Sequence, residues 1–424
     1  MCWGNCGDGP TRRPYRCASR PRKQTWLFPP ANRARHGVAS RTVLSCCGRV
    51  QLRRRRYDHS ADGSDAPVDD LIDWTQQSVS LAVREMCCRI AADAASFQRA
   101  AANLARVGQF QLSDELLRQV VESEGRAVLA WQDHEQLELD FDAGQCLTSA
   151  TFDGRPTTRV YVGIDGFMVP MVTDAENAKR WEKAKARRKH LRRRRGVRRR
   201  PLVRRCGADQ RYKEFKLVTF YDQELEHKRM RVTRHGPERA GKMLRGMAQD
   251  IRLHRAAQVA AVTDGAPWIA HLITAHLPDQ TMAILDFYHA AEHVHQARRT
   301  VFGEENAEGQ AWAGKLLTGM LQQPWDAWWE PLVQTRGRVR SATKRQSLDG
   351  LMQYLLIDYA RFRALGLKIG SGPTESGCKS HARRLKGVGM RWTPAHAEAM
   401  LALESLYQSN LWPAYWKSRL KAAA

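Results

Sequence analysis

The spacing of hydrophobic positions changes character along the chain. From Val68 to about Leu137, apolar residues recur every three or four positions, which predicts helices. The segment 95–108 reads as a helix ended by glycine, and Ser113 is placed to cap a second helix that reaches about Val128. This is the outline of a helix-turn-helix, although any all-helical subdomain would give the same pattern.

From Val160 the pattern becomes that of strands. Five apolar or alternating runs follow one another, at 160–165, 214–221, 228–234, 258–264 and 281–286. A polar turn separates the second run from the third, which predicts a hairpin. Helical spacing lies before and after the fourth run, and everything after His289 reads helical. This order predicts an α/β domain with a mixed sheet.

Residues 1–65 lack a helical period and are rich in Arg, Gly, Pro and Cys. Two β-prone runs, 41–44 and 49–57, flank a Cys-Cys-Gly turn and predict a basic hairpin. Zinc ligands could come from the first five of the ten cysteines, which are Cys2, Cys6, Cys17, Cys46 and Cys47. The two C-x2-C knuckles that make such a site convincing are absent, so we expect free thiols in a reducing compartment.

The net charge of the chain indicates the class of partner, whereas its composition is ordinary. The length of 424 residues predicts two or three domains, and 43% hydrophobic residues are ordinary for a globular protein. The balance of 69 Lys and Arg against 44 Asp and Glu gives a net charge of +25, which favours a nucleic acid as partner. Neither a signal-peptide pattern nor an apolar run of membrane-spanning length is evident, so we expect a cytoplasmic protein that does not bind a membrane.

A dense basic stretch interrupts the strand pattern at 179–205, where 16 of the 27 residues are Lys or Arg. Such a run repels itself, so we expect it to be mobile in the free protein and to order on the DNA backbone without reading sequence. A solubilising loop is the alternative. The expected phosphate contacts in its densest part are Arg192, Arg193, Arg194, Arg195, Arg198, Arg199 and Arg200.

Three aspartates, Asp165, Asp264 and Asp286, lie at or near the ends of predicted strands, where α/β sheets bind ligands. The first two are each followed by glycine, which predicts a sharp turn that exposes the carboxylate. Carboxylates brought together favour two Mg2+ or Mn2+ ions, which support phosphoryl transfer. A single aspartate in such a place is more often a turn or cap residue, and a cap of the helix starting at Phe287 is the expectation for Asp286.

A fourth element runs from Ile369 to Lys386. Its Gly-Ser-Gly-Pro turn predicts a helix start that places Glu375 in the first turn. Lys379 and Arg383 follow four and eight residues later and share its face. The alternative to a functional role for this face is a simple intrahelical salt bridge between Glu and Lys.

Taken together, these segments resemble the DDE transposases of bacterial insertion sequences, in particular the Kra-type group related to Mutator-like transposases. The matching strings are several, ordered and spread over about 155–410; they are VGIDGFMVP at 162–170, VTDGAPWI at 262–269, ILDFYHAAEH at 284–293, IGSGPTES at 369–376 and RLKGVGMRW at 384–392. The resemblance implies an RNase H-like catalytic domain with a helical insertion, preceded by a mostly helical DNA-binding region.

The resemblance also implies site residues and partners. Asp165, Asp264 and Glu375 would be the metal-binding catalytic triad, and Asp286 and His289 match the family's D-x-x-H string near the active site. The partners would be the element's terminal inverted repeats and target DNA, bound by a dimer or higher oligomer. Expected DNA contacts after the fourth carboxylate are Lys379, Arg383, Arg384 and Lys386.

The expected organisation has four parts. These are a basic segment at 1–65, a helical DNA-binding domain at 66–150, a catalytic domain at 155–410 with a helical insertion at about 295–365, and a tail at 411–424. Tryptophans between 312 and 329 fall in the insertion, where a structural core is the expected role for most of them. Two other functions stay open, namely a catalytically inactive DNA-binding protein, such as a decayed transposase, and a structure-selective RNase H-like nuclease.

Overall fold

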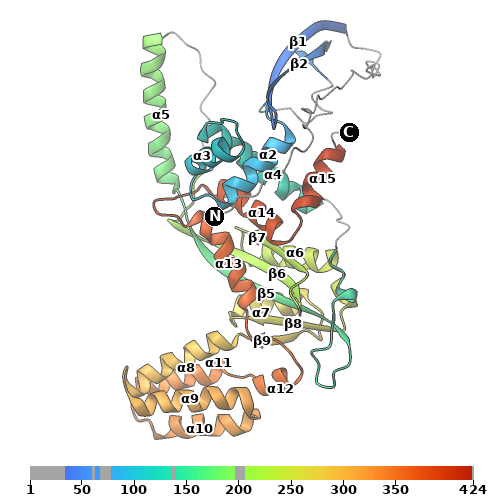
Figure 1. The fold of residues 1–424 in the computed structure, drawn as a ribbon. Coiled ribbons are helices and arrows are strands. Elements are labelled where there is room, and N and C mark those ends of the chain that lie inside the picture. The colour runs from blue at the N-terminus through green and yellow to red at the C-terminus, as the bar shows by residue number, and fades with distance from the viewer. Residues whose placement is uncertain (1–33, 60–62, 67–77, 135–139, 196–205, 423–424) are drawn as a thin grey trace, which may run out of the picture.

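A computed structural model describes residues 34–59, 63–66, 78–134, 140–195 and 206–422. Figure 1 shows a β-hairpin at one end of the molecule, a layer of helices beneath it, a central sheet, and a separate group of helices at the other end. Within the described residues, no helix has both the length and the apolar character needed to cross a membrane.

The N-terminal hairpin is confirmed and is longer than predicted. Strand β1 (Ala34–Ser45) pairs antiparallel with β2 (Gly48–His59), and the short β3 (Gly63–Asp65) adds to β2. The two cysteines at the turn, Cys46 and Cys47, are exposed and unpaired with each other. Cys2, Cys6 and Cys17 lie outside the described residues, so the expectation that they are free thiols stays a prediction.

The helices predicted around 95–130 are confirmed. Helices α2 (Leu81–Asp93), α3 (Phe97–Val107) and α4 (Asp114–His134) follow in order. The Ser113 hydroxyl accepts the amide of Leu116 at 3.2 Å, which is the expected cap of α4. The C-terminal helices α14 (Pro394–Gln408) and α15 (Trp412–Ala422) share a core with these helices, so the segment expected to be a tail contains a packed helix.

The central sheet confirms the predicted mixed α/β architecture. Its main strands, in the order in which they lie side by side, are β7 (Lys228–Thr233), β6 (Tyr212–Asp222), β5 (Thr157–Pro170), β8 (Gln258–Thr263) and β9 (Met282–Leu285). The pairs among β7, β6 and β5 are antiparallel, whereas β5–β8 and β8–β9 are parallel. The short β4 (Leu147–Thr148) adds to the start of β5.

The two faces of the sheet are covered by different helices. Val160, Val162 and Ile164 of β5 pack into a core with α6 (Pro237–Asp250) and α7 (Pro267–His276). Alternate residues point to the opposite face, where Phe167 and neighbouring strands share a core with α13 (Gly372–Leu385). Short 3-10 turns, η1 (Ala143–Gln145) and η2 (Leu253–Arg255), precede β4 and β8. The side of β5 that carries Asp165 is therefore the side that faces α13.

The helices after β9 form the separate group in Figure 1. They are α8 (Phe287–Phe302), α9 (Ala307–Gln322), α10 (Trp325–Arg338), α11 (Ala342–Tyr354) and α12 (Tyr359–Ala364). Trp328 is buried in their core, Trp325 stacks on Trp329, and Trp312 donates its indole N–H to Thr335. The expected structural role for most of these tryptophans is confirmed.

Candidate functional site

The candidate site lies where the parallel strands end, on the face of the sheet that α13 covers. Asp264 directly follows β8, and the next residue, Gly265, has a φ of +78°, so the predicted turn through glycine is confirmed. The same prediction is wrong for Asp165, because β5 continues to Pro170 and Gly166 stays paired with Lys216 of β6. Asp165 is nevertheless at an edge, since the pairing of β5 with β8 stops at Val162.

Close contact between β5 and α13 brings the fourth carboxylate to this place. A Cβ atom built on Gly163 would lie 1.7 Å from the hydroxyl of Thr374, the residue before Glu375. Thr374 itself is 1% exposed. Only glycine at this point of the strand lets α13 approach closely enough for its first turn to lie beside Asp165.

Gly163→Ala is therefore expected to lower the free energy of unfolding by about 1–3 kcal/mol, because the added methyl group must push α13 away from β5. Denaturant unfolding measures this loss. Gly314→Ala is the matched control, since Gly314 is exposed in α9 with nothing within 4 Å, and alanine there should be neutral or stabilising by about 0.5–1 kcal/mol. An equal effect of the two substitutions would contradict the assigned contact.

Asp165 is half-buried beneath α13. Its Oδ1 accepts the amide of Gly166 at 2.6 Å, and the Cys378 thiol donates a hydrogen bond to it. Burial is the main cause that raises the pKa of Asp165, and the negative charge of Asp264 adds to the rise. Hydrogen bonds and the nearby His289 act in the opposite direction. The carboxylate of Asp264 thus lies close enough to disfavour the ionisation of Asp165, an effect that a cation bound between the two would offset.

Two hydrogen bonds hold Asp264 in place after the end of β8. Its Oδ1 accepts the amide of Ala266 at 2.9 Å, which forms the turn into α7. The hydroxyl of Tyr354, from α11, donates to the Asp264 carbonyl at 2.5 Å. The helical group after β9 therefore contributes directly to the position of this strand end.

Glu375 lies with Asp286 and His289, and one possible ligand atom from each falls within 4.8 Å of the other two. Asp286 is fully buried and caps α8, because its Oδ1 accepts the amide of His289 at 2.9 Å, so the expected cap is confirmed. Its Oδ2 accepts the amide of Ser371, whose hydroxyl donates to Glu375 at 3.3 Å. Within the described part of the chain, this group does not extend to Asp165 or Asp264.

Two pairs of acidic residues thus lie near α13, and His289 is close to both pairs. One set is Asp165 with Asp264, and the other is Asp286 with Glu375. Sequence reasoning did not include Ser371 and Cys378, which contact these carboxylates. The spacing could have revealed Cys378, because it lies three residues after Glu375 and so on the same helix face.

The basic residues of α13 have unequal surroundings. Lys379 is exposed and lies 3.4 Å from Glu375, the ion pair that the spacing allowed, and Lys386 is also exposed. Arg383 is exposed too and pairs with Asp93 of α2 at 2.9 Å. Arg384 is 8% exposed; its guanidinium lies over the rings of Phe97 and Trp392 and donates to the carbonyl of Ala91. In this structure Arg384 packs two parts of the protein together and is not available to DNA.

The predicted disorder of the basic stretch is wrong for its described part. Residues 174–195 form one helix, α5 (Asp174–Arg195), which Figure 1 shows standing apart from the body of the molecule. Its start is a capping box, in which the Thr173 hydroxyl accepts the Glu176 amide and the Glu176 carboxylate accepts the Thr173 amide. Ala, Lys, Arg and Glu are good helix formers, and they offset the repulsion between like charges.

The side chains along α5 leave the basic charge open to solvent. The exposed cations among its described side chains are Lys179, Arg180, Lys183, Lys185, Arg187 and Lys189. Arg192 to Arg195 belong to the last turns of the helix, but their side chains lie outside the description. Arg198 to Arg200 are outside the described residues altogether.

The second helix of the predicted helix-turn-helix, α4, has one face buried in the protein. The buried face of α4 includes Leu117, Val120 and Val128, and a Cβ on its Gly125 would lie 2.2 Å from the carbonyl of Ala399 in α14. The α4 helix is thus a core element that crosses α14 at close range. Sequence periodicity could not show this contact, because Ala399 lies 274 residues after Gly125 in the chain.

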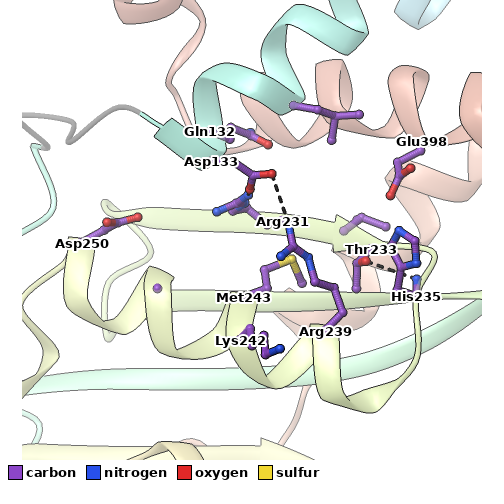
Figure 2. Close-up of a pocket in the computed structure, with 13 residues that line it drawn as sticks. Gln132, Asp133, Arg231, Thr233, His235, Arg239, Lys242, Met243, Asp250 and Glu398 are labelled. Carbon is purple, nitrogen blue, oxygen red and sulfur yellow. Dashed lines mark hydrogen bonds and ion pairs between the residues drawn. The ribbon is translucent and has the colours of Figure 1, made fainter.

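A pocket of about 430 Å³ lies on the far edge of the sheet, among α4, β7 and α6. Figure 2 shows Asp133 between Arg231 and Arg239, with ion pairs of 2.5 and 3.2 Å. Lys242 at its rim pairs with Glu238 at 2.9 Å. These cations already have acidic partners, so the pocket gives little attraction for a phosphate and is separate from the carboxylates under α13.

Comparison with known proteins finds a similarity in structure but none in sequence. No protein-family model matches the chain, and no curated protein matches its sequence. The chain is similar in structure to the Drosophila P element transposase strand transfer complex, with a TM-score of 0.36 and 13% sequence identity over 76% of this chain and 90% of that one. A TM-score of 0.36 reflects partial overlap of secondary-structure elements and does not establish a common fold.

Proposed function

We propose that this chain is a DDE-type polynucleotidyl transferase that cuts and joins DNA with bound metal ions, as a transposase of an insertion sequence does. The observation that carries the proposal is that two acidic pairs, Asp165 with Asp264 and Asp286 with Glu375, both lie near His289, in a chain with a net charge of +25. The proposed fold of this domain is RNase H-like, and the strand order β7-β6-β5-β8-β9 supports it.

The donor set fits divalent metal ions. Carboxylate oxygens are hard ligands suited to Mg2+ or Mn2+, and burial, followed by the nearby charge of Asp264, raises the pKa of Asp165. Asp165, Asp264 and Glu375 would hold the ions. When bound, such ions supply an activated water or hydroxyl and stabilise the leaving oxygen of a phosphodiester.

The remaining residues would bind and orient. Asp286 holds the backbone of Ser371, and Ser371 holds Glu375, so the start of α13 is fixed relative to α8. His289 lies beside Glu375 and near Asp165, where it could contact the scissile strand. Lys379 and the cations of α5 offer exposed positive charge for the DNA backbone, and target and element DNA would be held by a dimer or higher oligomer.

The experiment that tests the proposal uses DNA from both flanks of the reading frame, where terminal inverted repeats would lie. With Mg2+ or Mn2+, the protein should nick these ends and join them to a second DNA, and EDTA should abolish both reactions. Binding to the ends without nicking in either metal would favour the inactive DNA-binding alternative. Cleavage of branched DNA or hybrids without any dependence on end sequence would instead favour the structure-selective nuclease.

A further inference from the structure

A second group of possible metal ligands lies away from the carboxylates under α13. It consists of Cys146, Asp222 and His227, each of which offers one ligand atom within 4.8 Å of the other two. Asp222 ends β6 and pairs with Val160 of β5, five positions from Asp165 along the same strand. At about 3.4 Å per residue, the two groups are about 17 Å apart along β5, so this cluster is a different site.

The backbone fixes all three residues. The Asp222 amide donates to the His227 carbonyl at 3.2 Å, and the His227 amide donates to the Asp222 carboxylate at 3.3 Å, which closes the turn between β6 and β7. The Cys146 carbonyl accepts the amide of Arg159, which ties the segment between η1 and β4 to β5. Backbone pairing with β5 thereby holds Cys146 and Asp222 near each other although they are more than 70 positions apart, and the Asp222 carboxylate also holds the His227 amide.

The chemistry of the three side chains favours zinc over magnesium. One thiol, one imidazole and one carboxylate are the ligand types that Zn2+ binds, whereas a sulfur ligand disfavours the hard ions suited to the site under α13. The imidazole Nδ1 lies 2.8 Å from an oxygen of Asp222, a hydrogen-bond distance, and binding of one ion by both atoms would widen it to the roughly 3.3 Å that separates two ligands of a tetrahedral zinc. Cys146 and Asp222 are buried, while the His227 side chain is 33% exposed and leaves a path for the ion.

We infer that Cys146, Asp222 and His227 form a zinc-binding site that clamps the β6–β7 turn to the segment joining η1 and β4. Three protein ligands leave the fourth tetrahedral position to water or to another donor. The site would stabilise the edge of the sheet opposite the candidate catalytic centre. It does not depend on the proposed function.

The alternative is that the cluster is complete without metal. The imidazole Nδ1 of His227 is already hydrogen-bonded to an oxygen of Asp222, and the Cys146 thiol lies 3.4 Å from the carbonyl of Asp142 as a hydrogen-bond donor. This alternative predicts that added zinc has no effect that depends on Cys146. It is therefore the outcome against which the inference is tested.

The test uses the full-length protein freed of metal with a chelator and titrated with Co2+ as a spectroscopic substitute for Zn2+. Binding at Cys146 should give a thiolate-to-cobalt charge-transfer band in the near ultraviolet, which carboxylate sites cannot produce. Cys146→Ser should remove one equivalent of this band relative to the wild type. Cys206→Ser is the matched control, because Cys206 is an exposed thiol outside the cluster, and this variant should keep the full band.

Stability gives an independent measurement. Excess Zn2+ should raise the Tm of the wild type and of Cys206→Ser by a few degrees, and should leave that of Cys146→Ser unchanged. His227→Gln, which leaves the thiol in place, should lower zinc affinity at least about tenfold and covers the case that the Cys146 variant fails to fold. If Cys146→Ser and His227→Gln bind Co2+ and respond to Zn2+ as the wild type does, the inference is overturned. None of these results bears on DNA cleavage.

Discussion

Asp165→Asn, Asp264→Asn and Glu375→Gln are each expected to lower the rate of DNA cleavage by at least about a thousandfold while DNA binding stays within a few-fold of the wild type. A neutral amide keeps the shape of the side chain but loses the charge that holds a divalent ion, and metal stabilisation of the transition state amounts to several kcal/mol. Glu375→Gln retains an oxygen that can accept from Ser371, so the start of α13 should stay in place. Cleavage of labelled DNA and a binding titration on the same preparations measure the two effects.

Two further variants make this result specific. Asp279→Asn is the control for loss of an acidic charge, because Asp279 is exposed in the turn before β9, and it should cleave at the wild-type rate. Asp286→Asn tests the buried cap, since asparagine caps a helix about as well as aspartate but ligates metal poorly. We expect cleavage by Asp286→Asn within about tenfold of wild type if the cap is its main role, whereas a loss as large as that of Glu375→Gln would mean that Asp286 either ligates metal or is required to hold Ser371 beside Glu375, because the Asn amide nitrogen cannot accept the Ser371 amide. A Glu375→Gln protein that cleaves at nearly the wild-type rate would rule out the proposed triad.

The elements of the sheet were predictable because hydrophobic spacing reports which faces of a strand or helix are covered. All five main strands, β5 to β9, were expected near their observed positions. The helices between the later strands also predicted a sheet with both parallel and antiparallel pairs. The hydrophobic spacing predicted that this strand ends at Asp165, whereas β5 continues to Pro170. The Asp-Gly pair at 165–166 looks like a turn, but Gly166 stays in the strand, where a Cβ would lie 2.4 Å from Glu214 of β6. An Asp-Gly pair therefore does not by itself mark the end of a strand.

Contacts between distant parts of the chain account for most of what the sequence did not predict. Arg384 lies on the same helix as Glu375 and was expected to contact DNA, yet its guanidinium lies over the rings of Phe97 and Trp392. The group of Cys146, Asp222 and His227 forms only because β6 lies beside β5, so no local motif marks it. The triad itself could be proposed from the sequence only through family resemblance. The structure adds that α13 lies against β5 at Gly163, which is a physical reason for Glu375 to lie at this face.

The largest expected effect outside the carboxylates concerns the cations of α5. Replacing Lys179, Arg180, Lys183, Lys185, Arg187 and Lys189 together by Gln should weaken DNA binding at low salt by at least about a hundredfold, for specific and random DNA alike. Each lost phosphate contact should also reduce the slope of log affinity against log salt by about 0.9, so the total change counts the contacts. Gln keeps a high helix propensity, and circular dichroism should show unchanged helix content.

A helix makes a different kind of DNA contact from the mobile loop that the charge density predicted. Its cations are already arranged when DNA arrives, so binding does not require the ordering of a flexible segment, and the charges can follow a groove or a backbone as a rigid rod. The matched control is Lys315→Gln with Arg340→Gln, two exposed cations of the helical group after β9, which should change the salt slope little. If the α5 variant keeps its affinity for random DNA and loses only its preference for element ends, α5 reads sequence. Backbone binding would then be the wrong description of α5.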